Sequence, residues 1–293
     1  MAKNSSAADR RKAAREKARQ IAENDAKREK KARTILFGSV GVVVIAFAAV
    51  VGFLIFQSLQ PVAGPRNYAE GTLTVAKDGD ELKAYTAPGI EDPGENPPPP
   101  IAESPLGSDA AVVTVYFDFQ CPACKAFEDT HGTTLNKLVE DGKIALQYAP
   151  VAFLDNASGG NKFSTRAANA AACIADSGQV DAYREFVVSM FAQQPEEGGE
   201  GMEDDQLISI AEEAGVDVSA AVAPEDSDAS DVRSCITEQA FAKSVEKETQ
   251  TAFDDRGLSG TPRVLINGQE TESYREEDPE AFPLELLRAI GEK

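Results

Sequence analysis

The chain has 293 residues, of which 42% are hydrophobic, so it can form one large domain with appendages or two small domains. Residues 1–33 contain 12 basic and 5 acidic residues, whereas the rest of the chain contains 17 basic and 44 acidic residues. The acidic body argues against nucleic-acid binding there, because a phosphate backbone needs basic partners. A charge asymmetry this sharp indicates two compartments or two partners.

An uncharged run of 22 residues, 35–56, follows the basic arm. As a helix it would span about 33 Å, enough to cross a hydrocarbon core of about 30 Å. A buried helix of a soluble protein or a cleaved signal peptide is the alternative, but a signal peptide has a shorter apolar region and a small-residue cleavage site. We therefore predict a retained transmembrane helix at 34–58. The positive-inside rule places the basic arm 1–33 in the cytoplasm and the rest of this single-pass chain outside the cell membrane.

Residues 59–109 are predicted to be a linker. A short hairpin can form in 71–85, with its turn at Asp78-Gly79. Seven prolines then follow between positions 88 and 105, which favours extended polyproline II structure. The segment is interpreted as a semi-rigid spacer, with a disordered linker as the alternative.

From residue 110 to the C-terminus the pattern is that of a globular domain. It predicts the order β–α–β, a helical block, and then α–β–β–α. The expected elements are a buried strand at 111–117, a helix from Cys121 with a kink at Gly132, a strand stopped by Pro150, helices within 162–222, a helix at 231–255, a strand ending at Asn267-Gly268, an edge strand at 272–276 and a helix from 283.

Two of the four cysteines, Cys121 and Cys124, form a C-x-x-C motif at the strand-to-helix junction. Unpaired N–H groups and the helix dipole at a helix N-terminus stabilise a thiolate and lower its pKa. We therefore predict that Cys121 attacks and that Cys124, one turn deeper, resolves mixed disulfides. A structural disulfide within the motif is one alternative. A zinc site is another, but the chain has a single short-spaced pair and one histidine, and no metal is expected.

Cys173 and Cys235 are isolated and lie 62 positions apart on predicted helices. A disulfide between them would staple the helical block and, by loop-closure entropy, stabilise it by about 4 kcal/mol. The alternative is a pair of buried free thiols.

The segments "DFQCPACKAFE", "RAANAAACIA", "CITEQAFAKSVEKETQTAF" and "GLSGTPRVLING" resemble the membrane-anchored, DsbA-like proteins of the thioredoxin superfamily. The resemblance covers 110–293. It implies an α/β thioredoxin fold with a helical domain inserted at about 158–235, and it implies that Thr261-Pro262 is a cis peptide beside the C-x-x-C. Pro262 lacks an N–H, so the backbone of Thr261 could bind an extended substrate segment as an added strand. The alternative is a trans turn proline.

Two positions depart from the family pattern. The family often has an acid six residues before the first cysteine, where this chain has Val115; Asp118, Glu128 or water could substitute. The strongest oxidants of the family have His where this chain has Ala123, so a less extreme thiol pKa and reduction potential are expected. His131 is interpreted as a surface or packing residue.

The resulting hypothesis is a membrane-anchored thiol–disulfide oxidoreductase without a cofactor that introduces disulfides into exported proteins. Its expected partners are reduced or folding exported proteins and, by resemblance, a membrane reoxidase. Two alternatives stay open. One is a reductase or isomerase on the same scaffold, and the other is a tethered thioredoxin-fold binding module with inert cysteines.

Overall fold

The computed structural model divides into two units, Met1–Pro61 and Val62–Lys293, and the second contains the fold. The residues that the structure describes are 15–17, 19–20, 23–25, 27–28, 30–31, 46–53, 62–87, 98–107 and 110–291.

Most of the transmembrane helix expected at 34–58 lies outside the described residues. Its described part, 46–53, is helical and exposes Phe47 and Phe53. Along the described ranges, no helix is both long and apolar enough to cross a membrane. The basic arm is described only in short helical pieces, and the proline-rich stretch 88–97 lies outside the described residues.

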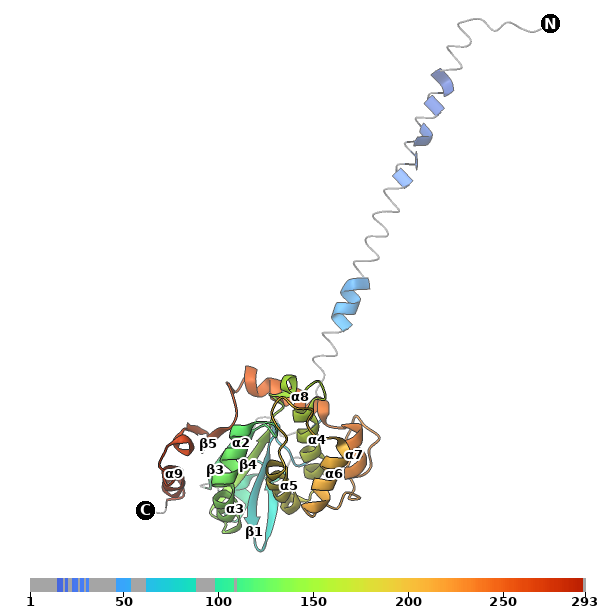
Figure 1. The fold of residues 1–293 in the computed structure, drawn as a ribbon. Coiled ribbons are helices and arrows are strands. Elements are labelled where there is room, and N and C mark those ends of the chain that lie inside the picture. Colours follow the sequence, from blue (N-terminus) through green and yellow to red (C-terminus); the bar gives the residue numbers. More distant parts are fainter. Residues whose placement is uncertain are drawn as a thin grey trace, which may run out of the picture. The chain divides into compact units, whose positions relative to one another are not determined.

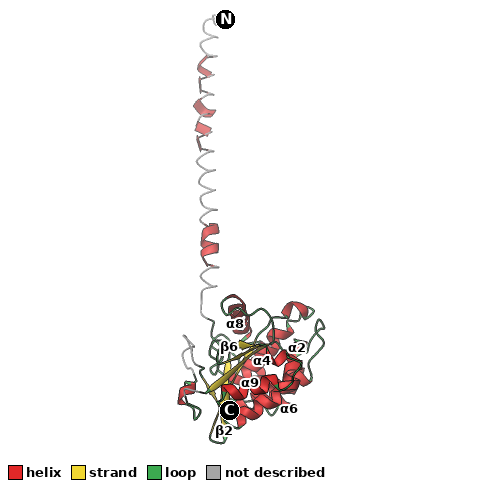
Figure 2. Ribbon diagram, turned by 90° about the vertical axis from the view of Figure 1, so that its left-hand side faces the viewer, coloured by secondary structure: helices red, strands yellow, loops and turns green. Residues whose placement is uncertain are grey.

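A six-stranded sheet organises the Val62–Lys293 unit, with helices around it (Figure 1 and Figure 2). Its strands are β1 (Leu73–Asp78), β2 (Glu81–Tyr85), β3 (Ala111–Phe117), β4 (Ile144–Pro150), β5 (Arg263–Ile266) and β6 (Gln269–Thr271). The strand order is β2-β1-β4-β3-β5-β6, and β3 and β4 form the parallel pair at its centre. All residues of β3 and β4 are buried, as their continuous apolar and β-branched sequences predict.

The expected hairpin at Asp78-Gly79 forms, but it is not part of a linker. β1 pairs antiparallel with β2 and also with β4, where Leu73 lies opposite Tyr148. Leu73 and Val75 are fully buried in the main core. The linker boundary at 109 is therefore wrong for residues 62–87, because an antiparallel strand with a buried face completes the sheet instead of spacing it from the membrane.

The helix that begins after Cys121 is interrupted where the sequence indicated a kink. It consists of α2 (Pro122–Phe127), a π-helical turn (Glu128–Gly132) and α3 (Thr133–Glu140). A Cβ atom on Gly132 would overlap the carboxylate of Glu128. Glycine at this position therefore leaves room for the Glu128 carboxylate at the C-terminal end of the turn.

The helical block consists of α4 (Phe163–Asp176), α5 (Val180–Ala192), α6 (Asp204–Glu213) and α7 (Val232–Glu238), followed by α8 (Ala242–Asp254). The prediction of one helix over 231–255 is wrong in its middle. Gln239 adopts a left-handed conformation, with φ of 52°, and ends α7. Short 3-10 turns lie at Ile101–Glu103 and Asp155–Ala157.

The C-terminal part contains β5, β6, a 3-10 turn (Ser273–Arg275) and α9 (Ala281–Ala289). The edge strand expected at 272–276 lies instead at Gln269–Thr271. Asn267 and Gly268 both have positive φ, so they form a two-residue turn and Ile266 pairs directly with Gln269. The last strand must therefore begin immediately after the turn.

Candidate active site

The C-x-x-C motif lies at the junction between β3 and α2. Cys121 is the N-cap residue of α2 and Pro122 occupies the first turn, where its missing N–H has no effect on helix bonding. Both cysteines are free thiols; Cys121 is 8% exposed and Cys124 is 2% exposed. The structure gives the two positions, whereas the attacking and resolving roles remain predictions.

The surroundings of the two thiols move their pKa values in opposite directions. The pKa of Cys121 falls to about 6, chiefly because Cys124 donates a hydrogen bond to its sulfur, with support from Thr261 and from the backbone N–H groups of Cys124 and Ala123. Burial raises the pKa of Cys124 well above its usual value, and its hydrogen bond to Cys121 adds to that shift. At neutral pH the pair therefore consists of one thiolate and one thiol, and Cys121 is the better leaving group.

The loop before β5 lies against Cys121, although it is 140 positions away in the chain. The Thr261-Pro262 peptide is cis. Cys121 Sγ lies 3.4 Å from the carbonyl oxygen of Thr261, to which the thiol can donate. Tyr274 Oη donates to the carbonyl oxygen of Pro262 over 2.8 Å. The fold thus brings the candidate substrate-binding residues Thr261 and Pro262 to the cysteines.

Asp118 lies between β3 and Cys121 and is fully buried. Burial raises the pKa of Asp118 to about 6. Its carboxylate accepts hydrogen bonds from the Gln120 N–H, the Leu154 N–H and the Ser164 hydroxyl, each at 2.8 Å. These bonds hold the loop that precedes Cys121, so Asp118 stabilises the structure of the site.

His131 is a packing residue. It is 5% exposed, and its ring lies 5.3 Å from that of Phe127 and 4.9 Å from that of Phe282, between ring centroids. Burial lowers the pKa of His131, so the neutral imidazole is favoured in this aromatic cluster. Within the described residues, no group of three or more His, Cys, Asp or Glu side chains is placed to hold a metal ion.

Gln194 contacts the active-site loop from the C-terminal end of α5, which the sequence reasoning did not foresee. Its side-chain amide donates to the carbonyl oxygens of Phe119 and Cys121, both at 2.9 Å. No motif marks a lone glutamine 73 positions from Cys121, so only the packing of α5 against α2 reveals this contact.

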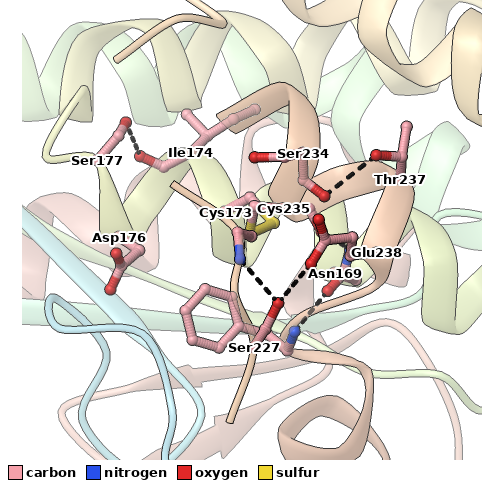
Figure 3. Close-up of a disulfide and its surroundings, with 12 residues drawn as sticks. Asn169, Cys173, Ile174, Asp176, Ser177, Ser227, Ser234, Cys235, Thr237 and Glu238 are labelled. Carbon is pink, nitrogen blue, oxygen red and sulfur yellow. Dashed lines mark hydrogen bonds between the residues drawn. A yellow bond between two sulfur atoms is a disulfide. The ribbon is translucent and has the colours of Figure 1, made fainter. Parts of the chain in front are cut away.

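Cys173 in α4 and Cys235 in α7 form a disulfide and are both fully buried (Figure 3). Beside it, Asn169 accepts a hydrogen bond from the N–H of Phe241 and its amide lies 3.4 Å from the carbonyl oxygen of Cys235. The disulfide therefore joins the first and last helices of the helical block and is separate from the C-x-x-C.

A family model described as thioredoxin matches residues 103–282. This chain belongs to the thioredoxin family. A reduced disulfide bond oxidoreductase, DsbG, from Mycobacterium tuberculosis is 30% identical with a TM-score of 0.55, over 77% of this chain and 90% of that one. Reduced DsbA from the same organism is 31% identical with a TM-score of 0.54, over 75% and 93%.

Among curated proteins, the chain is 27% identical over 194 residues to the serine/threonine-protein kinase PknE of Mycobacterium tuberculosis. The match covers 64% of this chain but only 31% of the kinase, so the chain spans about a third of the length of that relative. The DsbG and DsbA structures, which this chain covers almost completely, are the informative relatives. Within the thioredoxin family, this chain is a protein disulfide oxidoreductase.

Proposed function

We propose that this thioredoxin-family protein oxidises cysteine pairs in exported proteins through Cys121 and Cys124, while anchored in the cell membrane by residues 34–58. The observation that carries the direction is the opposite shift of the two thiol pKa values, down to about 6 for Cys121 and upward for Cys124. A stabilised Cys121 thiolate favours the reduced enzyme, and a disulfide whose reduced form is stabilised is a strong oxidant.

The proposed cycle has two exchange steps. A substrate thiolate attacks Cys121 Sγ in the oxidised enzyme, and the electron pair of the Cys121–Cys124 bond leaves with Cys124. A second substrate thiolate then attacks the substrate sulfur of the mixed disulfide, and Cys121 leaves as a thiolate. The substrate has lost two electrons as a new disulfide, and the enzyme holds them as two reduced cysteines.

Thr261 would hold the substrate during this exchange. Its carbonyl oxygen lies beside Cys121 Sγ, and Pro262 has no N–H that would pair with a neighbouring strand. An extended substrate segment could bind here by backbone hydrogen bonds, which suits a protein that must accept many sequences.

The topology belongs to the proposal as well. The uncharged run 35–56 and the 12 basic residues before position 34 support an N-terminus in the cytoplasm and an extracytoplasmic catalytic domain. Reduced enzyme then needs an electron acceptor in the same membrane, and we propose a membrane reoxidase for this step. Fusion of a reporter enzyme to the C-terminus, active only outside the cytoplasm, tests the orientation.

The experiment that tests oxidation is refolding of a reduced, denatured, disulfide-containing protein with the oxidised full chain. We expect C121S to lose the activity and A123S, an exposed change in the same motif, to keep it. We also expect C124S to accumulate substrate bound to Cys121 as a mixed disulfide. Undiminished oxidation by C121S would favour a binding module with inert cysteines instead.

A further inference from the structure

The cis-proline loop, residues 257–262, is held at its C-terminal end by the 3-10 turn that follows β6. Tyr274 Oη donates to the carbonyl oxygen of Pro262 over 2.8 Å, and Arg275 Nη2 donates to the same oxygen over 3.2 Å. A carbonyl oxygen has two lone pairs, so both acceptor positions of Pro262 are occupied. Because Pro262 also lacks an N–H, its backbone offers no free group to an incoming polypeptide.

Tyr274 also contacts the helix that carries the two cysteines. Its ring meets the ring of Phe127 edge-on, with 5.3 Å between the centroids, and Phe127 lies three residues after Cys124 on α2. The backbone carbonyl oxygen of Tyr274 lies 3.4 Å from Nε2 of His131, in the π-helical turn that continues α2. Tyr274 therefore joins two parts of the site that are far apart in the chain, α2 and the cis-proline loop.

The N-terminal part of the cis-proline loop is anchored differently. Leu258 is buried, and its N–H donates to the carbonyl oxygen of Ala252 on α8. The next residues are less closely packed, since a Cβ atom on Gly260 would have no heavy atom within 4 Å. The position of Thr261 therefore depends on the bonds that the following residue, Pro262, makes with the turn.

We propose that Tyr274 is a positioning residue, which fixes the cis-proline loop against α2 so that Thr261, and not Pro262, binds the backbone of a polypeptide substrate. The inference rests on the proposed disulfide exchange at Cys121 and Cys124. It adds the residue that sets where an extended substrate lies relative to Cys121 Sγ, which is 3.4 Å from the carbonyl oxygen of Thr261.

Of the two donors to Pro262, Tyr274 is the one that is packed into the site. The side chain of Arg275 is 55% exposed and also pairs with Glu272 over 2.7 Å. Its guanidinium lies over the Tyr274 ring, 5.0 Å from the centroid, and covers it. Burial raises the pKa of Tyr274 to about 12, so the hydroxyl keeps its proton and remains a donor wherever thiols exchange near neutral pH.

The proposal distinguishes two classes of substrate. A polypeptide binds the loop by backbone hydrogen bonds, whereas dithiothreitol reaches Cys121 Sγ without them. The chemistry balances in the same way for both: two substrate thiols lose two electrons and become a disulfide, and the Cys121–Cys124 disulfide gains them and becomes two thiols. Loss of the Tyr274 hydroxyl should therefore slow the reaction with a polypeptide and leave the reaction with dithiothreitol unchanged.

Rapid acid quench and mass spectrometry can follow reduction of the oxidised full chain by a two-cysteine peptide and by dithiothreitol. In Y274F, which keeps the ring, we expect the rate constant with the peptide to fall roughly fivefold, as for the loss of one hydrogen bond. The rate constant with dithiothreitol should stay within twofold of wild type, which also shows that the variant is folded. R275A should slow the peptide reaction by less, roughly twofold.

The matched control is Y85F. It removes a tyrosine hydroxyl that bonds the Asp78 carboxylate over 3.4 Å in the β1–β2 hairpin, and it should match wild type with both reductants. A peptide rate in Y274F within twofold of wild type, or an equal loss with peptide and dithiothreitol, would overturn the positioning role.

An N-methyl scan of the peptide tests the binding mode. Methylation of the backbone nitrogen that donates to Thr261 should slow the wild type roughly fivefold, and it should slow Y274F by much less, because that bond is already weakened. A wild type that no methylation slows, or an equal effect in both proteins, would contradict the proposal. If the wild type does not oxidise the peptide, the proposed function fails instead.

Discussion

At the scale of single residues, the site depends on the different surroundings of two neighbouring thiols. Cys121 is held at a helix start with donors around its sulfur, and Cys124 is enclosed by the core. The motif alone predicts this difference, because a C-x-x-C at a helix N-terminus exposes its first cysteine to the N–H groups and buries the second.

The hydrogen bond from Cys124 is the largest cause of the low Cys121 pKa, so its removal should be measurable. Thiolate absorbance at 240 nm, followed over pH, should give a pKa of about 6 for Cys121 in the reduced protein. In C124A, which removes the thiol donor, we expect the pKa of Cys121 to rise by about one unit or more. An unchanged pKa in C124A would mean that Thr261 and the backbone N–H groups set the value.

The same shift predicts how stability depends on pH. The pKa of Cys121 is about 6 in the folded protein and about 9 in the unfolded chain. Between these pH values the unfolded chain therefore binds one proton that the folded protein does not. The reduced protein should therefore gain, relative to C121S, about 1.4 kcal/mol of unfolding free energy per pH unit from about 6 upward. Urea unfolding of both proteins at pH 6, 7 and 8 measures this difference. A constant difference would contradict it.

The surroundings of Glu128 could not be predicted from the sequence. Glu128 was one of two nearby acids, and nothing in the spacing separates it from Asp118. Glu128 lines a small cavity beside Cys124 and Asp118 does not, because the cavity walls also come from β3, β4, α3 and α5, which lie far apart in the chain.

At the scale of elements, the end of α5 supports the active-site loop. Q194A removes the amide that bonds the carbonyls of Phe119 and Cys121, and partly buried acceptors without partners cost about 1–3 kcal/mol. We expect that loss of unfolding free energy and slower mixed-disulfide formation. Q193A, whose exposed amide bonds Glu213, should change stability by less than about 0.5 kcal/mol. Equal effects of the two variants would refute a specific role for Gln194.

The disulfide between α4 and α7 should act on stability and leave the exchange centre unchanged. It closes a loop of 62 positions, for which chain entropy gives about 4 kcal/mol. Urea unfolding of C173A/C235A should show a loss of that size, while reaction of Cys121 with glutathione stays within twofold of wild type. A stability loss below about 1 kcal/mol would contradict the entropic account.

Element types were predictable where periodicity or turn chemistry is strong, as for β3, β4 and the Asn267-Gly268 turn. The errors lie where tertiary contacts decide. The break at Gln239 lets the N–H of Phe241 donate a hydrogen bond to Asn169, which lies on a helix 72 positions away. The helical pattern of 231–255 does not indicate this distant partner.

At the scale of the whole molecule, the thioredoxin-like order of elements was predictable, but the predicted start of the domain at residue 110 was wrong. The turn signal at Asp78-Gly79 was visible, yet the following prolines made the segment resemble a spacer. Its pairing with β4 and the bonds between Arg66 and Asp176 tie it to the globular unit.

Truncation tests this boundary. A chain that begins at Val62 should fold with a full exchange rate at Cys121. A chain that begins at Ala110 exposes the β4 edge and loses the burial of Leu73 and Val75, each worth about 1.5–3 kcal/mol. We expect it to aggregate or to melt at a markedly lower temperature by circular dichroism. Equal melting temperatures would mean that residues 62–87 are dispensable.

The direction of electron flow is the central claim, and the reduction potential of the Cys121–Cys124 pair tests it most directly. Equilibration of the full chain with glutathione buffers measures this potential. The lowered pKa of Cys121, in a motif that has alanine and not histidine at position 123, predicts a reduction potential nearer to about −120 mV than to about −270 mV. A value near about −270 mV would contradict an oxidase and favour a reductase.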